Sequence, residues 1–430
     1  MRVFCLAALA SAIILAGCAT DSDKPILNTG LFATYPAPIY PPPDDSEIKT
    51  ADAVALALLD AGVSSLPFVA EPGPAAVAES IQNYSQNCLW ETADLKTALG
   101  LAIGDSMFGK RSALVLSAKQ FAELSPDLAL AAVQGANAGM VIIVLTDNAG
   151  RFTNAIIPPE PPAAASRMPY LMPGQTGNAY TRIHDAFLTS EQVGLPVIVM
   201  LEVDELIRPV PYIHNDFTSS NTRYRRNILT QLLSPALVTY QSRLVNARQL
   251  GDYKMVAPPQ TMPVVPDDLP QRFIPMFEFY APAMSVLASM RDDIGFVAVE
   301  GEILSFFAFE PFSIVDAAGF DGAAVPLAIR AEQNGFPPAW VVMECNSFLQ
   351  LGMNGIRTVM ESGMPVKMLV FNPGNPPVAA KMFQQIAGMT APENLHAIPV
   401  SATKGEFLEL LKKVNNSNNF ELVIVDYSAE

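Results

Sequence analysis

Short apolar runs alternate with helical patterns in two separate parts of this 430-residue chain. The runs of the first part are residues 113–116, 140–146 and 196–203, with helical patterns at 126–138 and 176–193. The second part starts at Ile294 and has runs at 339–343, 366–371, 397–400 and 421–426, with helical patterns at 352–362, 377–387 and 404–414. Strands that alternate with helices form parallel sheets covered on both faces. The sequence therefore predicts an α/β protein with two such sheets.

Composition and punctuation divide the chain further. Residues 18–50 are polar and proline-rich, which is typical of an extended tether. Seven prolines between residues 255 and 282 make regular structure there unexpected. We expect a signal peptide at 1–17, a tether at 18–50, an α/β domain at 51–215, a helical and Pro-rich connector at 216–290, and a second α/β domain at 291–430.

The amino terminus carries a 13-residue, mostly apolar run, residues 3–15, after the single positive charge of Arg2. Crossing a bilayer as a helix takes about 20 residues, so a run this short is typical of a secretion signal. The run ends in Leu15-Ala16-Gly17-Cys18, which resembles the bacterial lipoprotein lipobox. That resemblance implies a lipid-bearing Cys18 as the first residue of a mature, periplasm-facing envelope protein. Ala19 slightly favours the outer membrane, because the aspartate associated with inner-membrane retention is absent there.

Charge and cysteine content exclude several classes of partner. The formal net charge of −16 disfavours nucleic acid and adhesion to anionic lipid. Membrane attachment is therefore expected to come from the acyl chains. Once Cys5 leaves with the signal and Cys18 carries lipid, Cys88 and Cys345 remain, and two thiols cannot ligate a four-cysteine iron–sulfur cluster. They could form one disulfide or stay as buried free thiols.

Five stretches in a characteristic order carry a family resemblance. They are residues 94–106 (DLKTALGLAIGDS), 136–147 (ANAGMVIIVLTD), 193–201 (VGLPVIVML), 293–295 (DIG) and 341–372. Together they resemble thiamine-diphosphate enzymes, most specifically the alpha subunit of indolepyruvate ferredoxin oxidoreductase. The resemblance implies a pyrimidine-binding domain, then a diphosphate-binding domain, with the cofactor held between domains of two subunits. It also implies a homodimer, and a partner protein of the cell envelope is the alternative.

The family's catalytic glutamate has no counterpart in the best alignment. Thiamine chemistry needs a glutamate that hydrogen-bonds the aminopyrimidine, whereas Leu95 falls at that position and cannot exchange a proton. Asp94 or Glu91 could substitute if the alignment slips. We expect no catalytic residue at Leu95.

The family's metal-binding triplet is changed as well. Where the family has Gly-Asp-Ser or Gly-Asp-Gly and a later asparagine, this chain has Glu344, Cys345 and Asn346, followed by Asn372. A thiol is a soft ligand poorly suited to Mg²⁺, and Glu344 would place a carboxylate near a diphosphate. Asn346 and Asn372, with Asn375, could instead line a neutral polar pocket, or Phe348 or Met353 could fill the cleft. We expect no metal and no cofactor, with thiamine diphosphate and Mg²⁺ as the alternative.

Other candidate groups offer weaker chemistry. Residues 104–106 spell Gly-Asp-Ser but end a predicted helix instead of a strand. Ser117 and Lys119 would share one face of an extended segment, as a nucleophile pair requires. The three histidines, His184, His214 and His396, have no zinc-binding spacing. Arginines gather at positions 223, 225, 226, 243 and 248, on either a solvent-exposed connecting helix or an anion site.

The sequence thus predicts a lipid-anchored envelope protein with a thiamine-enzyme fold that binds or scaffolds without catalysis. The family's cysteine-rich ferredoxin segment has no counterpart after Val400, so no ferredoxin partner is expected. The alternative is an active thiamine-dependent enzyme acting on a 2-oxo acid, in which Asp94 or Glu91 and Asn346 take over the missing roles. A small-molecule receptor that uses the former cofactor cleft remains a third possibility.

Overall fold

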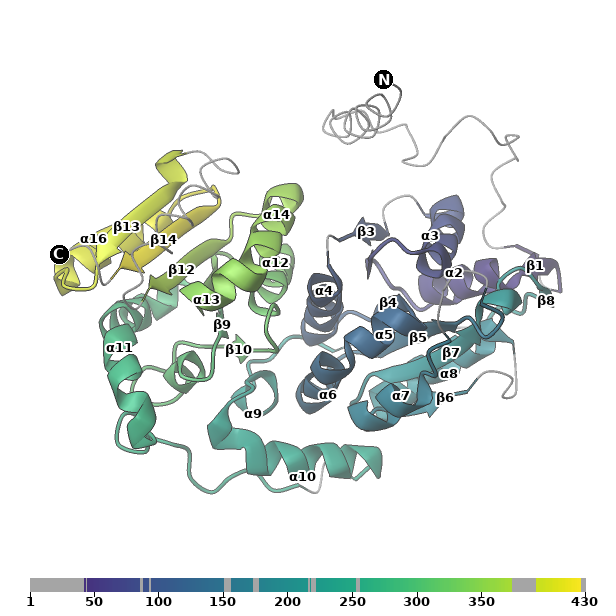
Figure 1. Cartoon of the computed structure of the whole chain (residues 1–430), viewed down its shortest axis with the longest axis horizontal. Helices are drawn as coiled ribbons and strands as arrows, with labels where there is room; N and C mark the ends of the chain where they lie inside the picture. The colour runs from purple at the N-terminus through teal and green to yellow at the C-terminus, as the bar shows by residue number, and fades with distance from the viewer. Residues whose placement is uncertain are drawn as a thin grey trace. The chain divides into compact units, whose positions relative to one another are not determined.

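The computed structural model of this chain describes residues 42–43, 45–85, 88–92, 94–150, 156–172, 178–215, 217, 222–252, 256–372 and 392–426 (Figure 1). The predicted signal, Cys18, nearly all of the tether, Asn375 and the helix expected at 377–387 lie outside these ranges. No helix in the described ranges has the length and apolar character needed to cross a membrane.

The first sheet has four parallel strands in the order β4-β5-β7-β6. These strands are β4 (Ser112–Ser117), β5 (Met140–Thr146), β7 (Val197–Glu202) and β6 (Tyr170–Leu171). Its helices are α2 (Thr50–Asp60), α3 (Pro72–Tyr84), α4 (Leu95–Met107), α5 (Ala118–Glu123), α6 (Ser125–Gln134), α7 (Glu160–Ser166) and α8 (Ala179–Val193). Two small pairs accompany it: parallel β2 (Leu66–Phe68) and β3 (Leu89–Glu91), and antiparallel β1 (Glu47–Lys49) and β8 (Pro209–Pro211).

The second sheet has six parallel strands in the order β10-β9-β11-β12-β14-β13. These strands are β10 (Ala317–Ala318), β9 (Phe296–Glu300), β11 (Ala339–Glu344), β12 (Lys367–Asn372), β14 (Glu421–Asp426) and β13 (Leu395–Pro399). The helices of this part are α11 (Ile274–Ser289), α12 (Ala324–Gln333), α13 (Cys345–Ser347), α14 (Met353–Ser362) and α16 (Lys404–Asn415). Between the sheets the chain forms α9 (Ile228–Gln231) and α10 (Val238–Gln249).

Both sheets bury both faces, as the apolar runs predicted. In β4, Leu114 and Leu116 enter one core, whereas Ala113 and Val115 enter another, because successive side chains of a strand point to opposite faces. The second sheet divides its side chains in the same way. One core contains side chains from the inner faces of both sheets. The predicted α/β class with two helix-covered parallel sheets is therefore confirmed.

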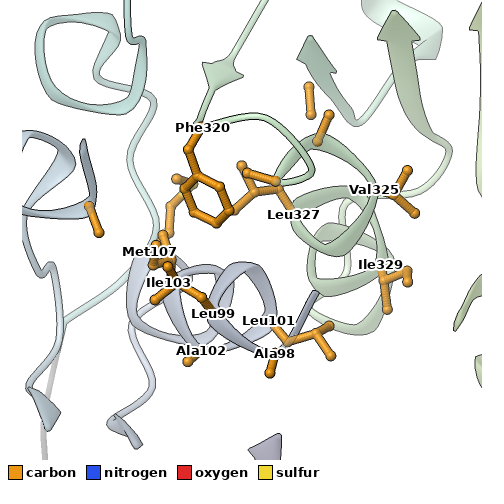
Figure 2. Packing of buried hydrophobic residues seen from close by; sticks show 14 of the residues in the cluster. Ala98, Leu99, Leu101, Ala102, Ile103, Met107, Phe320, Val325, Leu327 and Ile329 are labelled. Carbon is orange, nitrogen blue, oxygen red and sulfur yellow. The ribbon is translucent and has the colours of Figure 1, made fainter. Parts of the chain in front are cut away.

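Helices α4 and α12 join the two parts of that shared core (Figure 2). A β-carbon added at Gly100 would lie 2.4 Å from Pro326 Cγ, and one added at Gly104 would lie 2.7 Å from Arg330 Cγ. Only glycine allows so close an approach. Both contacts move four residues toward the carboxyl end in each helix, so the two helices run in the same direction. Figure 2 shows Phe320, from the loop before α12, and Leu327 among the buried side chains of this core.

The proline-rich connector is more regular than its sequence suggested. Helix α11 begins at Ile274 and contains both Pro275 and Pro282. Pro275 lies in the first turn, where a missing backbone N–H is tolerated. Pro282 lies inside the helix, whose buried side chains, including Phe277 and Met284, pack in the core. Apolar burial therefore overrides the local cost of Pro282, and the expectation of irregular structure up to Pro282 was wrong for this end of the segment.

Candidate functional site at the shared end of helices α4 and α12

Helices α4 and α12 begin at the same end of the helix pair, and each follows the carboxyl end of a strand. Helix α4 follows β3, and α12 follows β10 after a short loop. The carboxyl ends of parallel strands are the usual ligand position of an open α/β sheet. The candidate site is therefore the set of side chains around these two helix starts.

At the start of α4, Leu95 occupies the first helical position and is 9% exposed. Asp94 caps the helix: its Oδ1 accepts a 2.8 Å hydrogen bond from the Thr97 N–H, and its Oδ2 accepts a 2.7 Å hydrogen bond from the Thr97 hydroxyl. Both carboxylate oxygens of Asp94 thus accept hydrogen bonds at the start of α4. Glu91 ends β3, is exposed, and pairs through its backbone register with Phe68. Neither acid takes the position of Leu95.

Glu344 and Cys345, at the end of β11, have side chains on opposite faces of the sheet. Tyr280 donates a 2.8 Å hydrogen bond to Glu344 Oε1, and Tyr280 belongs to the core on the α11 face of the sheet. Cys345 belongs to the core on the opposite face. Burial raises the pKa of the Cys345 thiol to about 11, with a smaller contribution from Asp426, so the thiol is neutral near pH 7.

The three asparagines predicted to form a neutral pocket do not share one environment. Asn346 is exposed, whereas Asn372 is fully buried and donates a 3.1 Å hydrogen bond from Nδ2 to Asp426 Oδ1. Asn375 lies outside the described residues. Phe348 is fully buried and packs in the core shared by the two sheets, as a filling residue would. Asn372 thus has an acid beside it, and the neutral pocket stays a prediction.

The sequence interpretation missed Glu300, the last residue of β9. It is 1% exposed, and neither of its carboxylate oxygens has a hydrogen-bond partner in the described part of the chain. Burial, with a smaller contribution from Asp321, raises its pKa to about 7, although the nearby backbone amides of Gly322 and Ala324 and the charge of Lys96 oppose that shift. An acid that closes an apolar strand was the available signal. β7, β11 and β14 also end in an acid, so the pattern alone did not distinguish Glu300.

The Gly104-Asp105-Ser106 triplet has a structural role inside α4. Arg330 Nη2 of α12 lies 2.8 Å from Asp105 Oδ2, as an ion pair without hydrogen-bond geometry. Ser106 donates a 2.6 Å hydrogen bond to the Ala138 carbonyl. Burial raises the pKa of Asp105 to about 6, against the opposing charge of Arg330. The triplet therefore supports packing between α4 and α12 and lies away from the helix start.

Ser117 and Lys119 do not form the extended pair that was considered. Ser117 ends β4 and caps α5, while Lys119 lies in that helix. Both contact Glu71 instead: the Ser117 hydroxyl donates a 2.5 Å hydrogen bond to Oε2, and Lys119 Nζ lies 3.8 Å from Oε1. The β-strand ends before Lys119, so the assumed shared face does not exist.

The histidines and cysteines have structural contacts. His184 lies 3.2 Å from Asp185, and His214 lies 3.3 Å from Asp60. His396 of β13 lies 2.9 Å from Glu421 of β14. Cys88 and Cys345 are both buried, and no disulfide joins them to each other.

The arginine-rich segment is neither a single exposed helix nor a cluster around one ligand. Residues 222–227 precede α9 without regular structure. Arg226 pairs with buried Asp316 at 2.8 Å, and Arg248 of α10 is 6% exposed and donates a 3.0 Å hydrogen bond to the Val133 carbonyl near the end of α6. These arginines therefore attach the connector to both parts of the protein, and the interpretation as a solvent-exposed helix was wrong for Arg226 and Arg248.

The residues at the aligned positions do not supply what thiamine diphosphate with Mg²⁺ requires. Leu95 offers no carboxylate to an aminopyrimidine. In the described ranges no three His, Cys, Asp or Glu side chains converge on a metal position. Glu344 and Glu300 end the neighbouring strands β11 and β9, and neither acid offers a favourable contact to a diphosphate.

Comparison with known proteins extends the fold assignment. No protein-family model and no curated protein matches this chain. Among solved structures, the chain is similar to the X-ray structure of a candidate thiamin diphosphate-dependent enzyme from Mycobacterium smegmatis. The TM-score is 0.58 at 12% sequence identity, over 88% of this chain and 99% of that chain. This protein therefore has an α/β fold that resembles the domains of a thiamin diphosphate-dependent enzyme.

Proposed function

We propose that this chain is a lipid-anchored protein of the bacterial cell envelope in which a thiamine-enzyme fold serves binding or scaffolding and not thiamine catalysis. The start of α4 carries the proposal. Leu95 stands where the resemblance places the catalytic glutamate, and its acidic neighbour Asp94 uses both carboxylate oxygens to cap the helix. A proton relay to an aminopyrimidine needs a carboxylate that is free to bind the ring.

The second sheet supports the same conclusion. Cys345 is a neutral, buried thiol, and Glu344 is bound by Tyr280 on the other face of the sheet. A hard divalent cation prefers oxygen ligands, so this pair is a poor metal site. The finer resemblance, to the alpha subunit of indolepyruvate ferredoxin oxidoreductase, rests on the order of the motifs in the sequence.

Thermal unfolding of the purified full-length chain tests the loss of cofactor binding. We expect no change in melting temperature on adding thiamine diphosphate with Mg²⁺, whereas a ligand at 100 times its Kd stabilises a protein by about 2.7 kcal/mol. Mg²⁺ with pyrophosphate is the matched control for non-specific anion binding. A saturable rise with thiamine diphosphate alone among these ligands, together with decarboxylation of a 2-oxo acid, would support the active enzyme instead.

The lipid anchor has a separate test. In cells grown with labelled fatty acid, the wild-type chain should carry label and sediment with membranes, and Cys18→Ser should do neither. Cys5→Ser is the matched control, because Cys5 lies inside the predicted signal. Fractionation between inner and outer membrane would test the weaker expectation of an outer-membrane location. An unlabelled wild-type chain recovered in the soluble fraction would contradict the anchor and leave the proposal about catalysis unaffected.

A further inference from the structure

Glu300 is a buried acid without a hydrogen-bond partner at the junction between α4 and α12. Along β9, Phe296 and Ala298 belong to the core shared by the two sheets, and Glu300 lies on the same face because alternate side chains of a strand share a face. Its side chain is thus directed toward the helix pair. Neither carboxylate oxygen reaches solvent or a partner in the described part of the chain. Leaving a buried polar group unpaired costs free energy, and a charged group costs more than a neutral one.

Charged groups reach Glu300 from several elements. Asp321, in the loop before α12, raises the pKa of Glu300, and Lys96 of α4 lowers it. Lys96 is shared, because its Nζ lies 3.3 Å from Asp127 Oδ1 in the first turn of α6. Glu344, at the end of the neighbouring strand, is bound by Tyr280 on the opposite face of the sheet. The only full positive charge identified near Glu300 in the described ranges is therefore already paired with another acid.

The backbone at the start of α12 favours the charged form only in part. The amides of Gly322 and Ala324 lie near the carboxylate, and helix starts stabilise negative charge. Neither amide makes a hydrogen bond of normal geometry with it. Burial dominates, and the pKa rises from its ordinary value of 4.5 to about 7. Glu300 is consequently half protonated near neutral pH in the folded protein.

We propose that Glu300 makes the contact between α4 and α12 responsive to pH. A proton on its carboxyl group stabilises this contact, and loss of that proton weakens the contact. The inference is independent of the proposed envelope function. It assigns to the junction a proton as its ligand, bound at one carboxyl group between the two halves of the shared core.

The sign follows from the direction of the shift. A group whose pKa is raised by folding stabilises the protein fully below its unfolded pKa, and this contribution is lost as the pH rises through the folded value. For Glu300 the loss should occur between about pH 4.5 and pH 7 and level off above pH 7. Asp105, deeper in the same helix pair, shifts in the same direction but to about 6, so it contributes mainly at the acidic end of this range.

Hydrogen exchange on the full-length chain tests the proposal. Peptides that cover α4 and α12 are followed by mass spectrometry at pH 5 and pH 8, after correction for the intrinsic exchange rate. In the wild type we expect their protection to fall by about tenfold or more, since each pKa unit corresponds to a factor of ten in the equilibrium. In Glu300→Gln, which mimics the protonated acid, the fall should be much smaller.

Three further variants make the result decisive. Glu300→Met tests whether a neutral apolar side chain of similar length also removes the pH response, in case glutamine perturbs folding. Asp321→Asn changes an exposed acid of the adjacent loop and should keep most of the response. Asp105→Asn separates the contribution of the Asp105–Arg330 pair. The proposal is overturned if Glu300→Gln and Glu300→Met lose protection between pH 5 and pH 8 as strongly as the wild type.

Discussion

Two regions of the protein are stabilised in different ways. One is the contact between helices α4 and α12, and the other is the set of side chains at the carboxyl ends of the strands. The helix contact relies on small residues and one buried ion pair, with Gly100 and Gly104 against Pro326 and Arg330. The strand ends carry polar side chains in separate local contacts, such as Glu344 with Tyr280 and Asn372 with Asp426. In the first region, close packing limits the size of the side chains at the helix contact. The second does not assemble the groups that thiamine chemistry needs.

This difference is consistent with the proposal that the fold persists here without thiamine chemistry. Close helix packing depends on residue volume, and protein interiors are as dense as organic crystals, so a single methylene matters there. Catalysis depends instead on the identity of a few atoms. At the position where the resemblance places a glutamate, the isobutyl group of Leu95 offers no proton relay but suits a buried helix start. Variants that disturb the helix contact should therefore affect stability far more than variants at the strand and helix ends.

The largest effect is expected from Arg330→Met. It removes the cation beside Asp105 and the contact with the Trp90 ring at 4.9 Å, leaving a buried carboxylate unpaired. Breaking a buried pair on one side destabilises by about 3–5 kcal/mol. Urea unfolding at pH 8 measures this loss, and it should be smaller at pH 5, where Asp105 takes up a proton.

The double variant Arg330→Met/Asp105→Leu is the control for this pair. It should recover much of the stability, because no charge remains buried. A wild-type stability for Arg330→Met alone would mean that the ion pair does not hold the helices together.

Gly100→Val should be the next largest. Its β-carbon would lie 2.4 Å from Pro326 Cγ, and overpacking of this kind costs about 1–3 kcal/mol. Gly405→Val is the matched control, because Gly405 is exposed near the start of α16, with no atom closer than 3.8 Å to an added β-carbon. Equal unfolding midpoints for the two variants would contradict the close contact between α4 and α12.

The smallest effect is expected from Asp94→Ala, at the start of α4. Loss of the cap on Thr97 should cost about 1 kcal/mol, and Asp94→Asn, which keeps an acceptor oxygen, should cost less. Unfolding midpoints measure both. If Asp94→Ala kept wild-type stability but abolished binding of a ligand, Asp94 would be a binding residue, and the contrast between the two regions would need revision.

Much of the architecture was predictable from local sequence. The apolar runs at 140–146 and 421–426 coincide with β5 and β14, because strands buried on both faces read as continuous apolar segments. The candidate site was less predictable. Asp94 was considered as a substitute acid, but its role as a helix cap depends on where α4 begins. Helix boundaries are difficult to read to within one residue from sequence.

Local periodicity and residue identity were enough to predict the α/β class, the positions of the main strands and the residue types at the aligned family positions. The folded chain alone showed that Asp105 pairs with Arg330, that Glu344 and Cys345 face opposite sides of one sheet, and that Glu300 lies buried without a hydrogen-bond partner among the described residues. Burial and pairing involve residues far apart in the chain, so local sequence does not reveal them. The pKa of a carboxyl group, and its effect on stability, depend on the neighbours that folding brings to it.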